Sequence, residues 1–266
     1  MSDSYVALVQ APSHWHAVDF VSDLHLQGDD AVWQAFSQYL AQTPADAVFL
    51  LGDIFELWAG DDILDSVEHG AFERLVVEHL RQASQRTALY LMHGNRDFLI
   101  GTQFAQKAGL QLLADPCVLQ WHTGERTLLS HGDALCIDDE QYQQARAQFR
   151  HPAFLQQVLG QPLTARLTLA QQLRQQSAAR KNALGVEGYA DVDTPMARHW
   201  LHTHSAKLLV HGHTHKPDSH DLGDGLHRLV LPDWDSHSQP QRGGVMRYTP
   251  TAKQPWERLP IQFLLQ

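Results

Sequence analysis

The stretch LLVHGHTHKP, residues 208–217, places His211, His213 and His215 at every second position directly after an apolar run. In an extended chain this spacing brings all three imidazoles to the same side. Neutral imidazole is the commonest nitrogen ligand for metals in proteins, so the stretch indicates a metal site at the end of a buried strand. A histidine-rich surface turn is the alternative, because the chain contains 18 histidines in all.

Four earlier stretches share this pattern of a short apolar run that ends in a polar cluster. With the histidine stretch, they predict strands within 17–26, 46–58, 87–98, 126–135 and 207–217. Helical periodicity at 29–43 and 67–85 separates the first three runs, as in the strand-helix-strand units of a largely parallel inner sheet. Side chains beyond the carboxyl ends of such strands meet at one edge, where we therefore expect a site.

The residues expected at this edge combine carboxylate, amide, guanidinium and imidazole groups. In chain order they are Asp23 and His25, Asp53, Asn95 and Arg96, His131, and His213 and His215. The mixed oxygen and nitrogen ligands suit manganese, iron or zinc, and a carboxylate such as Asp53 can bridge two ions. Taken singly, each has an ordinary structural explanation, since an aspartate after a strand often caps a helix and Gly-Asn often forms a turn.

Glycines precede three of these ligands, at Gly52, Gly94 and Gly212. We expect the backbone to turn sharply at these glycines so that the next side chain points inward.

Composition limits the class of protein. A chain of 266 residues with 43% hydrophobic content can bury a core, and we expect a single domain over 1–266. The formal net charge of −10 argues against nonspecific binding to a nucleic-acid backbone. Cys117 and Cys136 lack C-x-x-C spacing, which argues against a disulfide framework and a cysteine zinc site. With no signal-peptide pattern and no membrane-spanning apolar run, we expect a cytoplasmic protein with at most peripheral membrane contact.

The motifs D-x-H, G-D, G-N-R-D, H-G-D and G-H-T-H, in this order, resemble those of the calcineurin-like metallophosphoesterases. That resemblance implies an α/β fold, a β-sandwich flanked by helices, with a site for two metal ions. More narrowly, the blocks SDLHL, LGDIFELWAGDD, HGNRDFLIG, HGDALCIDD and HGHTHKP are similar to those of the diphosphatases that cleave UDP-2,3-diacylglucosamine in lipid A biosynthesis. Arg96 in G-N-R-D supports the narrower resemblance, since many relatives carry a histidine there.

The resemblance also implies a set of ligands. One divalent ion, expected to be Mn²⁺, would be held by Asp23, His25, Asp53 and His215. The second would be held by Asp53, Asn95, His131 and His213. His211 is then left either to support the site or simply to pack. The planar guanidinium of Arg96 suits a phosphoryl oxygen, although an ion pair with Asp97 or Asp139 is an alternative.

The reaction implied by the resemblance is hydrolysis of a pyrophosphate bond, with water activated by the two ions. The water would attack the phosphorus that bears uridine, releasing UMP and 2,3-diacylglucosamine 1-phosphate, while Asn95, Arg96 and His213 contact the developing charge. Two alternatives stay open. One is a metallophosphoesterase acting on a soluble nucleotide diphosphate or phosphodiester. The other is a non-catalytic scaffold, whose signature would be lost ligands, and none is lost here.

The segment 141–186 differs from the rest of the chain, because it is rich in arginine and contains no aspartate or glutamate. Its apolar residues recur every three to five positions, which predicts two or three short amphipathic helices broken at Pro152, Gly160 and Pro162. The pattern alone favours a helical cap whose leucines pack on the domain and whose arginines are solvated.

The family resemblance implies instead that this cap insertion holds acyl chains, so that the partners are a lipid-linked UDP-sugar and the surface of the inner membrane. Asp139 and Ser177 match positions that contact the substrate, and Lys181 is a further candidate. The position seven after the serine is Leu184, where relatives have a lysine. No protein partner is indicated. The tail 238–263 is expected to form a final hairpin that closes the sheet.

Overall fold

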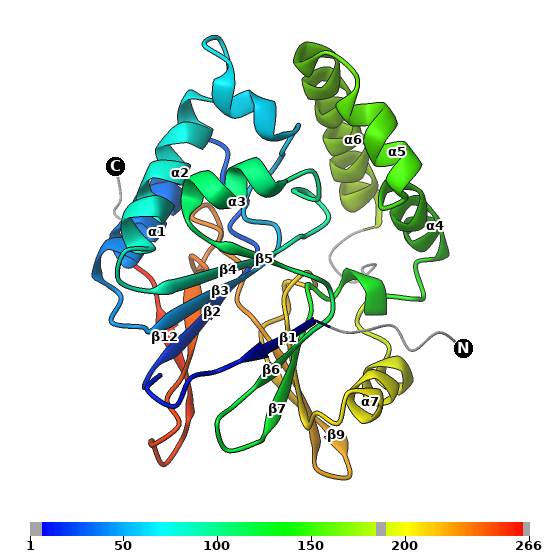
Figure 1. Cartoon of the computed structure of the whole chain (residues 1–266). Helices are drawn as coiled ribbons and strands as arrows, with labels where there is room; N and C mark the ends of the chain where they lie inside the picture. The colour runs from blue at the N-terminus through cyan, green and yellow to red at the C-terminus, as the bar shows by residue number, and fades with distance from the viewer. Residues whose placement is uncertain (1–6, 185–189, 263–266) are drawn as a thin grey trace.

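The computed structural model describes residues 7–184 and 190–262, with the side chains of 176–184 outside the description. Two six-stranded sheets pack face to face, and helices cover their outer sides (Figure 1). The first sheet has the order β12-β11-β2-β3-β4-β5, with β2 to β5 parallel to one another. Its strands are β2 (Val18–Val21), β3 (Ala47–Leu51), β4 (Ala88–Met92), β5 (Gln111–Leu113), β11 (Gly244–Tyr248) and β12 (Trp256–Pro260).

The second sheet has the order β1-β6-β7-β8-β10-β9 and mixes parallel with antiparallel pairs. Its strands are β1 (Ala7–Gln10), β6 (Cys117–Gln120), β7 (Arg126–Leu129), β8 (Leu208–His211), β9 (Ser219–Gly223) and β10 (Leu226–Val230). Strand β8 lies parallel to both of its neighbours, β7 and β10. The carboxyl ends of β7 and β8 therefore point in the same direction.

Alternation along the central strands produces the layers. In β3, Phe49 and Leu51 pack in the core between the two sheets, whereas Val48 and Leu50 pack in the core beneath the helices. A strand buried on both faces is expected to be apolar throughout, as AVFLL is. The helices over the first sheet are α1 (Ala31–Gln42), α2 (Ala71–Ala83) and α3 (Thr102–Ala108), and α7 (Thr194–Thr203) covers the second sheet.

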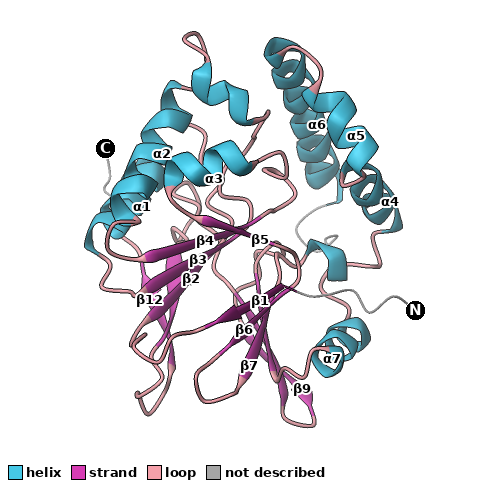
Figure 2. Ribbon diagram, viewed as in Figure 1, coloured by secondary structure: helices cyan, strands magenta, loops and turns pink. Residues whose placement is uncertain are grey.

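Three helices lie to one side of the sandwich as a separate group (Figure 2). We call α4 (Glu140–Phe149), α5 (Pro152–Leu159) and α6 (Leu163–Leu184) the cap. Pro152 stands in the first turn of α5, where a missing N–H costs little. The prediction of two or three helices broken at these prolines is confirmed, although the third is long at 22 residues.

The predicted α/β sandwich is confirmed, and so are the final hairpin of β11 and β12 and the helices within 29–43 and 67–85. The parallel inner sheet predicted for the first three runs is confirmed in β2, β3 and β4, whereas β7 and β8 belong to the second sheet. Pairing between distant strands leaves no local trace in their sequences, so the assignment to sheets could not be predicted from the period of two. The extent of the domain over 1–266, with a cap insertion at 141–186, stays a prediction.

Candidate metal centre

The loops that follow β2 and β3 run side by side beyond the ends of these strands. The backbone N–H of His25 donates to the carbonyl of Asp53 at 3.0 Å, and that of Glu56 donates to the carbonyl of Leu26 at 3.0 Å. The two loops thereby continue the parallel pairing of the strands. His25, Asp53 and Glu56 are brought together by this pairing.

Five of the predicted ligands have left-handed backbone conformations, with φ between 51° and 65°. They are Asp23, His25, Asp53, His213 and His215. Residues other than glycine rarely adopt this conformation, and it persists only where the surroundings hold the chain firmly. Such strain collects at functional sites, and here it turns the side chains out of the strand direction and toward one another.

The glycines before the ligands do less turning than expected. Only Gly52 has a positive φ, whereas Gly94 and Gly212 do not. These two permit close approach instead, because a Cβ atom at Gly94 would overlap Asp53 and one at Gly212 would overlap Asp23. The bend lies in the ligands themselves, and the glycines make room for them.

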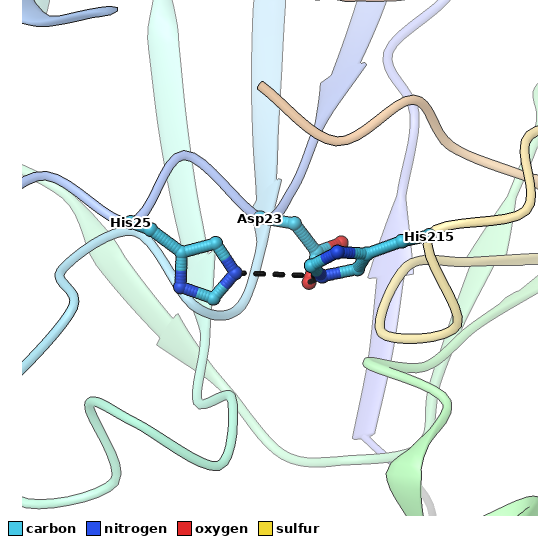
Figure 3. A group of neighbouring side chains, drawn as sticks. All are labelled: Asp23, His25 and His215. Carbon is cyan, nitrogen blue, oxygen red and sulfur yellow. Dashed lines mark hydrogen bonds and ion pairs between the residues drawn. The ribbon is translucent and has the colours of Figure 1, made fainter. Parts of the chain in front are cut away.

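Asp23, His25 and His215 form the first group of candidate ligands, with one nitrogen or oxygen from each within 4.8 Å of the others. The Nε2 atoms of His25 and His215 face each other at 3.4 Å, as Figure 3 shows. Asp23 Oδ1 is 3.4 Å from His215 Nε2, and this buried oxygen accepts no hydrogen bond. Three potential ligand atoms thus converge with one carboxylate oxygen left to bind a cation.

Asp23, Asp53 and His131 form the second group under the same limit of 4.8 Å. His131 Nε2 lies 3.1 Å from Asn95 Oδ1 and 3.7 Å from Asp53 Oδ1. His131 Nδ1 lies 2.9 Å from the carbonyl oxygen of Leu51, which can only accept, so Nδ1 carries a proton and donates. When Nε2 is unprotonated, its lone pair faces the acidic side chains.

The outer nitrogens of the other two histidines also have partners. His25 Nδ1 is 3.0 Å from Glu56 Oε2, and His215 Nδ1 is 3.5 Å from Asp233 Oδ2. A carboxylate or carbonyl on the far nitrogen fixes the tautomer and the orientation of a metal-binding histidine. The donors therefore fit divalent ions of the manganese, iron or zinc type.

Burial and neighbouring charges give the candidate ligands different protonation states when no metal is bound. Burial raises the pKa of Asp23, but the nearby histidines, His215 first among them, outweigh burial, and this pKa lies far below its usual value. Burial lowers the pKa of His131, yet nearby carboxylates, Asp53 first among them, raise it to about 9. Burial and then the charge of His131 lower the pKa of His213 to about 3. At neutral pH, without a metal, His131 is therefore protonated and His213 is neutral.

A family model of the calcineurin-like phosphoesterases matches residues 16–217, which span both groups of ligands. The chain belongs to the calcineurin-like phosphoesterase family. The predictions of this family and of a metal-dependent hydrolase are confirmed.

Several bacterial relatives match over most of their own length. A UDP-2,3-diacylglucosamine hydrolase of Chromobacterium violaceum is 42% identical over 233 residues, which cover 86% of this chain and 94% of the relative. The enzyme of the same name from Chromohalobacter salexigens is 43% identical and covers 85% of this chain and 91% of its own. That of Pseudomonas aeruginosa is 42% identical, with 82% and 91% covered.

In this calcineurin-like phosphoesterase, His213 lies beside the two groups of candidate ligands, whereas His211 packs next to them. The backbone N–H of His213 donates to Asp23 Oδ2 at 2.9 Å, and its ring centroid is 5.0 Å from that of His131. His211 is buried, with Nδ1 2.8 Å from the carbonyl oxygen of Gly212, and burial lowers its pKa to about 4. His211 is therefore a buried, neutral histidine that packs beneath the loop after β8.

Arg96 and Asp139 have partners that the sequence did not indicate. Arg96 Nη1 is 3.8 Å from Oε1 of Glu56. Asp97 is buried and accepts the backbone N–H groups of Ile54 and Gly94. Asp139 caps the start of α4 through the N–H of Tyr142.

The side chains of Ser177 and Lys181, two predicted substrate contacts, lie outside the described residues.

Three acidic residues of the phosphoesterase site were missed in the sequence. Glu56 and Asp233 contact the ligands His25 and His215, as described above. Asp133 is buried and accepts hydrogen bonds from the Tyr142 hydroxyl at 2.7 Å and from Arg146 Nε at 2.8 Å. Asp233 follows the end of β10, so the rule that located the ligands could have found it. Asp133 is the aspartate of the H-G-D motif after β7, so the same rule could have found it. Glu56 gave no such signal, because its role depends on contacts between distant segments.

Proposed function

We propose that this chain hydrolyses the pyrophosphate bond of UDP-2,3-diacylglucosamine to UMP and 2,3-diacylglucosamine 1-phosphate, using two divalent ions that we take to be Mn²⁺. The relatives named above carry the substrate in their names. The observation that carries the proposal is a cavity of about 390 Å³ between the cap and the loops that carry Glu56, Asn95 and Arg96. Asn95 and Arg96 line it together with apolar side chains of all three cap helices.

The lining of the cavity matches a substrate with a charged head and apolar tails. Its apolar side chains are Leu57, Trp58, Phe98, Leu99, Ala145, Phe149, Phe154, Val158, Leu169, Ala170 and Leu173. Phe98 stacks on Phe149 with 6.1 Å between ring centroids, so the sandwich and the cap meet in this wall. A soluble nucleotide diphosphate would leave such a surface without a partner, which favours the lipid substrate.

The arginines of the cap are mostly engaged rather than solvated. Arg146 contacts Asp133, Arg150 donates to the carbonyl of Gly94 at 2.8 Å, and Arg166 pairs with Asp62. The alternative of an ordinary cap with free arginines is therefore less well supported. These contacts hold the cap next to the loops that carry the ligands.

Bound divalent ions would lower the pKa of water and offset the charge of the pyrophosphate oxygens. Asp23, His25, Asp53, Asn95, His131, His213 and His215 would hold them. The guanidinium of Arg96 would bind a phosphoryl oxygen, and the Asn95 amide and the neutral His213 ring offer further polar contacts to it. In-line attack at the phosphorus bearing uridine would make the other phosphate the leaving group.

Acyl chains in the cavity would contribute much of the binding energy, about 0.8 kcal/mol for each buried methylene. Binding of the acyl chains, remote from the reacting phosphorus, also orients the pyrophosphate over the metal ligands. Asp139, Ser177 and Lys181 would contact the sugar phosphate. Because the substrate is a lipid, we place the protein in the cytoplasm, in peripheral contact with the inner membrane. In the part of the chain that the structure describes, no helix is long and apolar enough to cross a membrane.

The test is kcat/KM for UDP-2,3-diacylglucosamine beside UDP-N-acetylglucosamine, in the same detergent and with Mn²⁺. We expect the diacylated substrate to be better by several orders of magnitude, since only this substrate has acyl chains to fill the apolar part of the cavity. Phe154→Ala in α5 should reduce this preference, while Asp65→Asn, in a surface pair with Lys107, should leave it intact. Comparable kcat/KM values would instead favour a soluble nucleotide-sugar pyrophosphatase.

A further inference from the structure

Glu56 lies between the metal centre and the cap and has a separate partner on each carboxylate oxygen. Oε2 is 3.0 Å from Nδ1 of the ligand His25. Oε1 is 2.8 Å from Nε of Arg174, a residue of cap helix α6. The glutamate is largely buried, at 13% exposure, so it has few alternatives to these partners.

Arg174 joins α6 to both ligand-bearing loops. Besides Glu56 in the loop after β3, its Nη2 donates to Gln27 Oε1 at 2.9 Å in the loop after β2. Arg166 holds the same helix near its start, through Asp62 and the carbonyl of Ala59. The two arginines are eight residues apart, or about two helical turns, so α6 is fixed at two points along its length.

The chemistry of Glu56 makes its two contacts interdependent. A carboxylate offers two acceptor oxygens, and here both face donors. A glutamine of the same shape offers one acceptor and one donor, so it can satisfy His25 or Arg174 but not both. The orientation of His25 and one attachment of α6, through Arg174, thus both depend on Glu56.

We propose that Glu56 is a positioning residue that couples the metal centre to the cap by holding His25 with one oxygen and Arg174 with the other. Metal binding then stabilises the docked position of α6, and docked α6 strengthens metal binding by the same factor, because such coupling is reciprocal. The inference rests on the metal centre of the proposed function and not on its lipid substrate.

The experiment uses Mn²⁺ alone as the probe, on the full chain stripped of metal and then reloaded. Hydrogen exchange is followed in peptides covering 163–175, and the Mn²⁺ dissociation constant is measured in parallel. In the wild type, Mn²⁺ should slow exchange in this segment by about fivefold or more. Asp65→Asn is the matched control, since it neutralises a surface carboxylate paired with Lys107 at 2.8 Å and should behave as the wild type.

Two variants test the two contacts separately. Glu56→Gln should abolish the slowing and raise the Mn²⁺ dissociation constant by about 10- to 100-fold, as loss of a partner on a ligating histidine does. Arg174→Ala should fold normally, because this side chain is 45% exposed. In this variant Mn²⁺ should no longer slow hydrogen exchange in 163–175. The Mn²⁺ dissociation constant should rise only by the factor by which Mn²⁺ slows exchange in the wild type.

Slowing that persists in Glu56→Gln, or wild-type Mn²⁺ affinity in that variant, would overturn the proposal. Hydrogen exchange and the Mn²⁺ dissociation constant are measured without substrate. They therefore test the coupling even if the protein does not cleave the lipid.

Discussion

At the scale of single residues, Asp53 has a strained backbone and two contacts on one carboxylate oxygen. Its φ is 52°, its Oδ1 accepts the N–H of Arg96 at 2.8 Å, and the same oxygen lies 3.7 Å from His131. Burial raises its pKa, so without a cation the charged form is disfavoured. A carboxylate kept in this state is suited to bridging metal ions.

Replacing Asp53 tests that bridging role. Asp53→Asn keeps the shape of the side chain but removes the negative charge, so we expect turnover to be abolished and at least one metal position to be lost. Metal content by elemental analysis and turnover on the same sample check this. Substantial activity in a metal-replete Asp53→Asn enzyme would contradict the proposal that Asp53 bridges two metal ions.

Arg96 is expected to act on the transition state. Arg96→Ala should lower kcat by about a hundredfold or more and leave metal content unchanged, since its guanidinium is not among the metal ligands. Steady-state kinetics with metal analysis separates this role from a structural one. Loss of metal in the same variant would mean that Arg96 instead supports the centre, through Glu56.

His131 ties metal binding to pH. Its pKa of about 9 means that the metal-free chain carries a proton there at neutral pH, and a histidine must lose that proton to bind a metal. Metal affinity should therefore rise as pH increases toward 9, and binding near pH 7 should release at least about one proton. Calorimetry in two buffers with different ionisation heats measures the release, and heats independent of the buffer would refute it.

At the scale of elements, the ends of β2, β3, β4, β7 and β8 bring the site together from two sheets. Their polar ends could be predicted, because apolar runs that stop at aspartate, asparagine or histidine are a local signal. The assignment of β7 and β8 to the second sheet, the role of Glu56 and the left-handed backbone of the predicted ligands could not, since they arise from contacts between segments distant in sequence. The sequence also placed the turning at the glycines, whereas it lies in the ligands.

Gly94 tests the close approach of the loops after β3 and β4. In Gly94→Ala the new methyl group would overlap Asp53, so the loop must shift, and we expect about 1–3 kcal/mol of destabilisation together with weakened metal binding. Gly28→Ala is the control, because nothing lies within 4 Å of its Cβ position. Urea unfolding and metal titration of both variants check this, and equal results would argue against the tight fit.

At the scale of the whole molecule, one chain combines a buried candidate metal centre on a sandwich with a helical cap. The cap lines a cavity together with Asn95 and Arg96. Arginines of the cap reach acidic groups beside the ligands, so the apolar wall and the charged centre are held in register. Such an arrangement suits a substrate that is both a pyrophosphate and a lipid. The resemblance of the sequence motifs implies the same substrate class.

The most direct test is hydrolysis of UDP-2,3-diacylglucosamine in heavy-oxygen water, with both products analysed by mass spectrometry. The account predicts UMP and 2,3-diacylglucosamine 1-phosphate only when Mn²⁺ is present, with the heavy oxygen in UMP. Absence of cleavage by the Mn²⁺-loaded enzyme, or cleavage that persists after metal removal, would contradict it.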